Sequence, residues 1–113
     1  MKIQLISAAM LLGLAACNQS ATEKKADAIE ENADATADAI RDNAEVQADA
    51  LENKADSVEA TGDSMTATGE ARADAAAANM ETQADNIRAQ AEAKADNVEA
   101  KGDNKAEAVR DQK

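Results

Sequence analysis

The sequence predicts an all-α protein, and specifically a single long amphipathic helix built on an 11-residue repeat. The chain of 113 residues contains no proline and no aromatic residue, and alanine, the strongest helix former, supplies most of its apolar content. A short Ala-acid-x-aliphatic unit recurs along it, and its aliphatic residues are spaced by nearly whole numbers of helical turns. These three observations favour helix over strand throughout the repeat region.

The repeat unit reads Ala, then Asp or Glu, any residue, and an aliphatic residue. It occupies residues 26–29, 37–40 and 48–51, and it returns at 55–58, 84–87, 95–98 and 106–109. A longer copy relates residues 54–65 to 94–105, with eight of twelve positions identical. Internal duplication of a short helical unit is the simplest account of this pattern.

The large aliphatic residues define one apolar stripe, separated by 11, 11, 7, 7, 15, 7, 11 and 11 residues. At 100° per residue they fall within an arc of about 80°, and only Val46 lies outside it. Within the repeat units, an Asp two positions before the aliphatic residue falls on the opposite face, while the Ala three positions before it widens the stripe. The members of the stripe are Ile29, Ile40, Leu51, Val58, Met65, Met80, Ile87, Val98 and Val109.

Residues 60–69 form a soft point in this helix, because two glycines and several hydroxyl side chains lower helix propensity there. A hinge near 61–69 would allow a helical hairpin with two arms of about forty residues. The stripe nevertheless keeps its phase from Val58 through Met65 to Met80. We therefore expect a continuous helix of about 130 Å from Glu23 onward, with the hairpin as the alternative.

A globular core is excluded, because ten modest aliphatic side chains after residue 17 cannot offset the ordering of nearly a hundred residues. We expect the helix to be marginally stable or partly disordered as a monomer. Acidic side chains also stack four residues apart at Asp34, Asp38 and Asp42, and again at 103, 107 and 111. Such like-charge pairs destabilise a helix, so salt and diffusely bound divalent cations are predicted to raise its helicity.

The first residues have the layout of an export signal. Lys2 precedes an apolar stretch over residues 3–14, which is shorter than the roughly 20 residues that span a bilayer, and small residues lead to Cys17. The run Leu14-Ala15-Ala16-Cys17 resembles the bacterial lipobox. That resemblance implies cleavage before Cys17 and a lipid anchor on its sulfur and amino group, with more than one acyl chain for stable membrane attachment.

This resemblance divides the chain into a signal peptide at 1–16, a lipidated cysteine with a polar tether at 17–25 and the repeat region at 26–113. Asn18 follows the cysteine. In the enterobacterial sorting pattern an Asp at this position favours retention in the inner membrane, so Asn18 implies the outer membrane, facing the periplasm. Ser20 and Glu23 fit a capping box at the start of the helix. No disulfide within the chain is available, because Cys17 is the only cysteine.

The composition argues against an enzyme and against nucleic-acid binding. The chain has no His and no Tyr, and carboxylates on an exposed helix lack the desolvated pocket that tunes a catalytic group. After residue 16 there are 11 basic and 23 acidic residues, a formal charge of −12 that repels nucleic acid and anionic lipid surfaces. No calcium-loop motif is present, so neither a metal site nor a cofactor is expected.

The lipobox, the acidic aromatic-free helical repeat and the lysine at position 113 together resemble the Braun-type helical lipoproteins of the outer membrane. In that family a terminal lysine is joined to peptidoglycan, which would make Lys113 the attachment residue. The preceding Arg-Asp-Gln departs from the usual ending of the family, and an incidental lysine is the alternative. The function expected on this resemblance is a lipid-anchored rod that self-associates as a homo-oligomer, or spaces the outer membrane from the cell wall.

Residues 26–111 are also similar in style to group 3 late-embryogenesis-abundant proteins, which have 11-residue, Ala-rich amphipathic repeats and few aromatics. That resemblance implies a stress protectant that becomes helical on drying or on binding. Abundant Asp and scarce Lys depart from the pattern. An acidic cation reservoir at the envelope is a third hypothesis, and it needs no specific fold.

Overall fold

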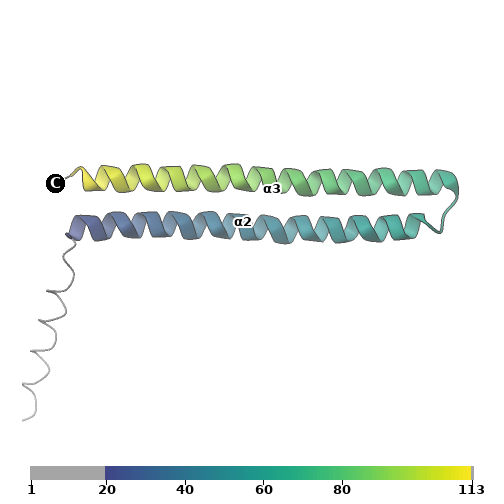
Figure 1. Ribbon diagram of the computed structural model, residues 1–113, viewed down its shortest axis with the longest axis horizontal. Helices are drawn as coiled ribbons and strands as arrows, with labels where there is room; N and C mark the ends of the chain where they lie inside the picture. The colour runs from purple at the N-terminus through teal and green to yellow at the C-terminus, as the bar shows by residue number, and fades with distance from the viewer. Residues whose placement is uncertain (1–19, 113) are drawn as a thin grey trace, which may run out of the picture.

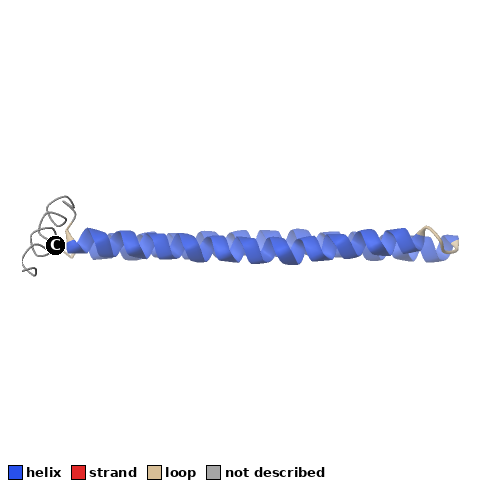
Figure 2. Cartoon of the chain, turned by 90° about the horizontal axis from the view of Figure 1, so that it is seen from below, coloured by secondary structure: helices blue, strands red, loops and turns tan. Residues whose placement is uncertain are grey.

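The computed structural model describes residues 20–112, which form two long helices packed side by side in opposite directions. Helix α2 spans Ala21–Gly62 and helix α3 spans Ala67–Arg110, and a short turn joins them (Figure 1). Seen from the perpendicular direction, the two helices lie one behind the other, so the molecule is a single layer two helices wide (Figure 2). The fold is an all-α helical hairpin with the shape of an extended rod.

The expected all-α fold is confirmed, but the expected continuous helix is wrong, because the chain reverses at residues 63–66. The hairpin alternative is the correct one, and the turn lies within the glycine- and hydroxyl-rich segment. Each arm of 42 or 44 residues is about 65 Å long, half of the length expected for an unbroken helix. The physical reason is that pairing the two arms buries the small residues of both, which a single helix leaves exposed to water.

The turn is held by backbone hydrogen bonds of its own. The Asp63 amide donates to the Glu59 carbonyl at 3.0 Å, and the Met65 amide donates to the Gly62 carbonyl at 2.8 Å. The Ser64 hydroxyl donates to the Thr61 carbonyl at 2.9 Å. Thr66 is extended, with φ −68° and ψ 159°, and it begins α3 without a side-chain cap. The turn therefore supplies donors for the carbonyls of Glu59, Thr61 and Gly62 at the end of α2, and no residue among 20–112 has a positive φ.

The start of α2 is capped as the sequence predicts. Ser20 is the N-cap residue, and its hydroxyl accepts a hydrogen bond of 3.2 Å from the Glu23 amide. The helix already begins at Ala21, within the 17–25 segment that the sequence analysis treats as a tether. Only the part of that segment before residue 20 lies outside the described residues.

The core between the helices consists entirely of alanine and glycine. We call this set the alanine seam; its members are spaced only by four or seven residues along each helix, which keeps them on one face. It comprises Ala26, Ala33, Ala37, Ala44, Ala48, Ala55 and Gly62 on α2, and Ala73, Ala77, Ala84, Ala91, Ala95, Gly102 and Ala106 on α3. Because no large side chain separates them, the two backbones approach closely along their full length.

Two glycines of the seam mark the closest approaches. A β-carbon added at Gly62 would lie 2.5 Å from the Ala73 Cβ, and one added at Gly102 would collide with the Ala33 Cβ. No pair of carbon atoms tolerates such a distance, so one partner of each pair has to lack a side chain. The pairs Gly62–Ala73 and Gly102–Ala33 therefore fix the register of the hairpin near both of its ends.

Candidate functional site

The side chains on the two sides of the alanine seam differ in chemistry, so the hairpin has two chemically different surfaces. Eight seam alanines, which are at most 1% exposed, are each followed three residues later by a large aliphatic side chain. Four residues after each of them comes an arginine or a glutamate. Positions three and four residues on lie at about −60° and +40° around a helix, so they flank the seam on opposite sides. Since the helices are antiparallel, the positions three residues after the seam alanines of α2 and α3 lie on one face of the hairpin. The positions four residues after them lie on the other face.

The first of these surfaces, the arginine face, carries three clusters in which an arginine reaches across to acids of the other helix. Arg41 on α2 donates to Glu92 at 3.0 Å, to Asp96 at 3.3 Å and to Glu99 at 2.6 Å on α3. The guanidinium presents a planar fork of five N–H groups, which suits it to several carboxylates at once.

Arg88 forms the second cluster in the reverse direction, from α3 to α2. It donates to Glu45 at 3.0 Å and to Asp49 at 3.1 Å, and it also donates to Glu52. The guanidinium of Arg88 thus faces the same Glu, Asp, Glu order that Arg41 faces on the other helix. Its side chain is 30% exposed, like that of Arg41.

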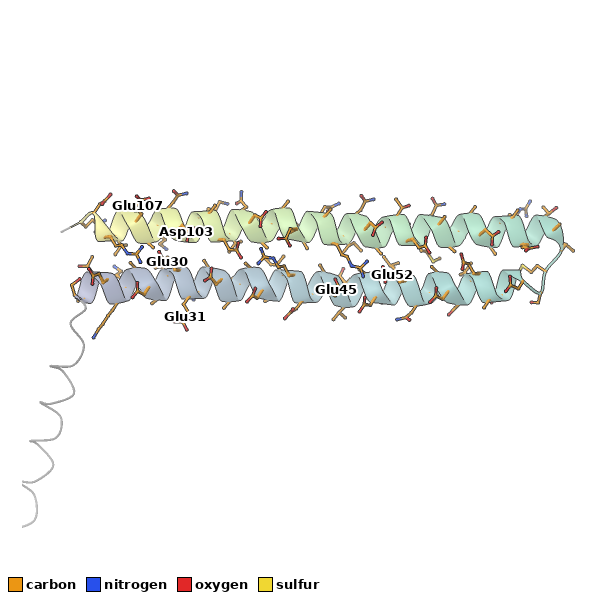
Figure 3. All side chains as sticks on the ribbon, in the orientation of Figure 1. Glu30, Glu31, Glu45, Glu52, Asp103 and Glu107 are labelled. Carbon is orange, nitrogen blue, oxygen red and sulfur yellow. The ribbon has the colours of Figure 1, made fainter. Side chains whose placement is uncertain are left out.

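Arg110 forms the third cluster near the ends of the hairpin. It donates to Glu30 at 2.6 Å and 3.0 Å through two nitrogens, and to Asp27 at 3.0 Å. In Figure 3, Glu30 lies between the two helices, whereas its neighbour Glu31 points away from α3. This bidentate pair ties the last turn of α3 to the first turns of α2.

Each cluster shifts the acid–base equilibria of its arginine and of one of its glutamates. A hydrogen bond from Arg110 holds the pKa of Glu30 below its ordinary value of 4.5, and Arg88 and Arg41 do the same to Glu52 and Glu99. Hydrogen bonds from the facing glutamates raise the pKa of each of the three arginines further. Glu30, Glu52 and Glu99 are therefore stabilised in their charged form.

A second internal repeat, which the sequence analysis missed, explains the first two clusters. Arg88 follows Arg41 by 47 residues, and residues 36–57 match residues 83–104 at eleven positions. Each copy contains an arginine and, further on, a Glu-Asp-Glu set, and the arginine of one copy pairs with the acids of the other. The identical positions of the first copy are Ala37, Asp38, Ile40, Arg41, Ala44, Glu45, Ala48, Asp49, Glu52, Lys54 and Asp56. The signal was available in the sequence as the spacing of the arginines.

The opposite surface, the aliphatic face, carries eight of the nine predicted stripe residues. They are half-buried, because they cover the edges of the seam from one side. Shallow grooves run between the helices here, one lined by Ile40 and Ile87 and another by Ile40 and Val98. The eight residues are Ile29, Ile40, Leu51, Val58, Met80, Ile87, Val98 and Val109.

The two remaining large apolar residues of the described range 20–112 lie apart from this face. Met65, the ninth stripe residue, is in the turn and is 52% exposed. Val46, which the sequence places outside the stripe, is 71% exposed. The buried interior thus belongs to the alanines that precede the stripe residues, and the stripe residues themselves flank it.

The residues predicted for lipidation, for membrane sorting and for peptidoglycan attachment lie outside the described part of the chain. They are Leu14, Ala15, Ala16 and Cys17 of the lipobox, Asn18, and Lys113. The contact of Arg110 with Asp27 shows that the ends of the helices leading to positions 17 and 113 lie side by side (Figure 1). In the hairpin, the length of the rod therefore does not separate those two ends.

Within residues 20–112, no helix is long and apolar enough to cross a membrane. The same residues contain no group of three or more His, Cys, Asp or Glu side chains arranged to hold a metal ion. No protein-family model, curated protein or solved structure shows a significant match to the chain. The function has to be argued from the geometry of the hairpin and the N-terminal motif.

Proposed function

We propose that this chain is a non-catalytic, lipid-anchored structural protein of the bacterial cell envelope, facing the periplasm from the outer membrane. The proposal joins two observations. Residues 14–17 resemble a lipobox, which would supply a membrane anchor, and α2 begins at Ala21, only four residues after Cys17. The folded part is a rod whose described residues bury no ionisable side chain and leave no buried side-chain polar atom without a partner.

The observation that carries the proposed mode of action is the aliphatic face. Eight half-buried aliphatic side chains lie on one side of the hairpin, while the opposite side is occupied by charged clusters. Residues that cover only the edge of a core gain further burial when a similar surface packs on them, at about 25 cal/mol per Å² of apolar area. We infer that anchored hairpins self-associate through this face, with the arginine face turned to solvent.

The hairpin favours self-association over the spacing of membrane and cell wall through Lys113. A spacer would need its two attachment points at opposite ends of the rod. The helix ends leading to Cys17 and to Lys113 lie together instead. A peptidoglycan link at Lys113 would therefore hold the wall close to the membrane-proximal end of a closed hairpin.

The anchor is tested by labelling cells with radioactive palmitate. The wild-type chain is expected to be labelled and a Cys17→Ala variant is expected to carry no label. Equal labelling of both chains, or of neither, would overturn the lipoprotein assignment.

Self-association is tested by sedimentation equilibrium of residues 17–113 carrying Cys17→Ser. The Ile40→Ser, Ile87→Ser double variant is expected to weaken association, because both side chains line the same groove of the aliphatic face. Val46→Ser is the matched control, since Val46 is 71% exposed and lies off that face. Equal weakening by both substitutions, with helicity retained, would rule out the aliphatic face as the contact surface.

A further inference from the structure

The alanine seam continues in phase through the turn, although the turn interrupts both helices. Gly69 follows Gly62 by seven residues and precedes Ala73 by four, the only two spacings used within either arm. If residues 62–73 formed one helix, Gly62, Gly69 and Ala73 would lie on a single face. In the hairpin this continuity has no structural role. The non-helical residues of the turn determine the orientation of α3 about its own axis independently of α2.

The turn contains nothing that prevents it from becoming helical. Asp63 already has helical angles, with φ −55° and ψ −25°, and no residue among 20–112 has a positive φ. The segment 63–66 has neither proline nor glycine. Thr66 is the N-cap residue of α3, but its side chain forms no capping hydrogen bond. Straightening the segment therefore breaks no capping bond of Thr66.

Every contact between α2 and α3 can also form between two chains. The clusters of Arg41, Arg88 and Arg110 and the register pairs Gly62–Ala73 and Gly102–Ala33 all join one helix to the other. In an antiparallel pair of straightened chains, α2 of each chain would meet α3 of its partner with the same contacts, formed twice. Residues near Gly69 would cross at the centre, where a residue without a side chain permits close approach.

We propose that a second copy of this chain is a partner of the hairpin, and that two copies exchange α3 through straightening of residues 63–66. The product is an antiparallel two-chain rod about twice as long as the hairpin. This proposal rests on the seam and on the turn, and it depends neither on the aliphatic face nor on the lipid anchor.

Proline at position 67 discriminates between the two forms. Ala67 is the first residue of α3, where a proline is well tolerated, and Thr66 before it already has the extended conformation that proline requires. In a straightened chain the same proline would stand inside a long helix and break it. Ala67→Pro is therefore expected to keep the hairpin and to weaken the exchanged dimer about a hundredfold or more. Ala67→Ser is the matched control and should still exchange.

Exchange is read out with nitroxide labels at Asp34→Cys and Asp103→Cys, in residues 17–113 with Cys17→Ser. Both positions are exposed, and each follows a residue of the Ala33–Gly102 contact. In the hairpin the labels are neighbours within one chain, whereas in a straightened chain the 69 residues between them span about 100 Å. The doubly labelled chain is unfolded and refolded together with an excess of unlabelled chain. The distances between the labels are then measured by pulsed electron–electron double resonance.

Exchange predicts that the short distance, present in the labelled chain alone, disappears when unlabelled chain is in excess. It also predicts that Ala67→Pro retains the short distance under the same dilution. A dimer in which the short distance survives dilution would overturn exchange while supporting association of closed hairpins. A chain that stays monomeric at every concentration would overturn both, and exchange in Ala67→Pro equal to that in Ala67→Ser would overturn the role of the turn.

Discussion

Arg41 and Arg88 occupy equivalent positions in the hairpin, each reaching across the seam from one helix to a Glu-Asp-Glu set on the other. The two arginines are 47 residues apart, and so are the acid sets that they contact. The exchange of partners between the two copies gives the hairpin an approximate two-fold symmetry. It also fixes which residues of α2 and α3 are opposite one another, a choice that alanine packing alone specifies weakly.

The contribution of the arginine face is tested by Arg88→Gln. Arg88 contacts three acids of α2, so its loss is expected to lower the thermal midpoint and to leave three carboxylates close together. Arg72→Gln is the control, because Arg72 forms no ion pair with any residue in the described range 20–112. The difference in midpoint between the two variants should shrink at 1 M NaCl, since salt screens exposed charges. Equal midpoints at low salt would show that the cluster adds no stability.

The pH dependence follows from the lowered pKa of Glu52. Its folded-state pKa is below the ordinary value of 4.5, so its pairing with Arg88 stabilises the fold above pH 4.5. That stability is lost as the pH falls through the folded-state pKa. Glu52→Gln is therefore expected to lower the midpoint at pH 7 and to have little effect at strongly acidic pH.

Glu107→Gln serves as the matched control for this titration, because Glu107 is exposed and forms part of an acidic stack with Asp103 and Asp111. Removing its charge is expected to leave the midpoint unchanged or to raise it slightly. A Glu52→Gln effect that is the same at pH 7 and at acidic pH would contradict the ionic origin of its contribution.

Close packing of the seam is tested at Gly102. A methyl group there would collide with the Ala33 Cβ, so Gly102→Ala is expected to cost about 1–3 kcal/mol in free energy of unfolding, despite its better helix propensity. Ala33→Gly in the same chain should recover part of this loss, because it provides space on the facing helix. Chemical denaturation of both single variants and the double variant measures the coupling, and additive effects would mean that the helices do not touch here.

Divalent cations should raise the helicity of the chain. Asp34, Asp38 and Asp42 remain stacked on one exposed side of α2, as do the acids at 103, 107 and 111 at the end of α3, where Asp111 is the C-cap residue. Far-UV circular dichroism at low salt, before and after addition of millimolar Mg²⁺, measures the effect. Unchanged helicity would show that repulsion between these carboxylates is negligible.

The helical class, the capping Ser20 and the position of the weak segment could all be predicted from the sequence. Periodicity places residues on a face of a helix, and it correctly excluded Val46. It could not decide between a straight helix and a hairpin, because the seam and the stripe keep their phase through the turn. That decision depends on contacts between residues far apart in the chain, such as Gly102 with Ala33.

The arrangement of the two faces was also only partly predictable. Large aliphatic side chains are usually taken as the core, and here they flank it, because alanine allows the backbones to approach more closely than Ile40 or Ile87 would. The repeat of the aliphatic residues gives no indication of the arginine clusters, because the two patterns have different periods. The spacing of Arg41, Arg88 and the Glu-Asp-Glu sets contained the information.

The most direct test of the central claim is far-UV circular dichroism of residues 17–113 with Cys17→Ser, combined with sedimentation, over a hundredfold range of concentration. The hairpin predicts strong helicity at the lowest concentration, since its contacts form within one chain, and a mass that rises with concentration as the copies associate. A coil spectrum at every concentration, becoming helical only on drying or with added lipid, would contradict the account and favour a stress protectant that folds on binding.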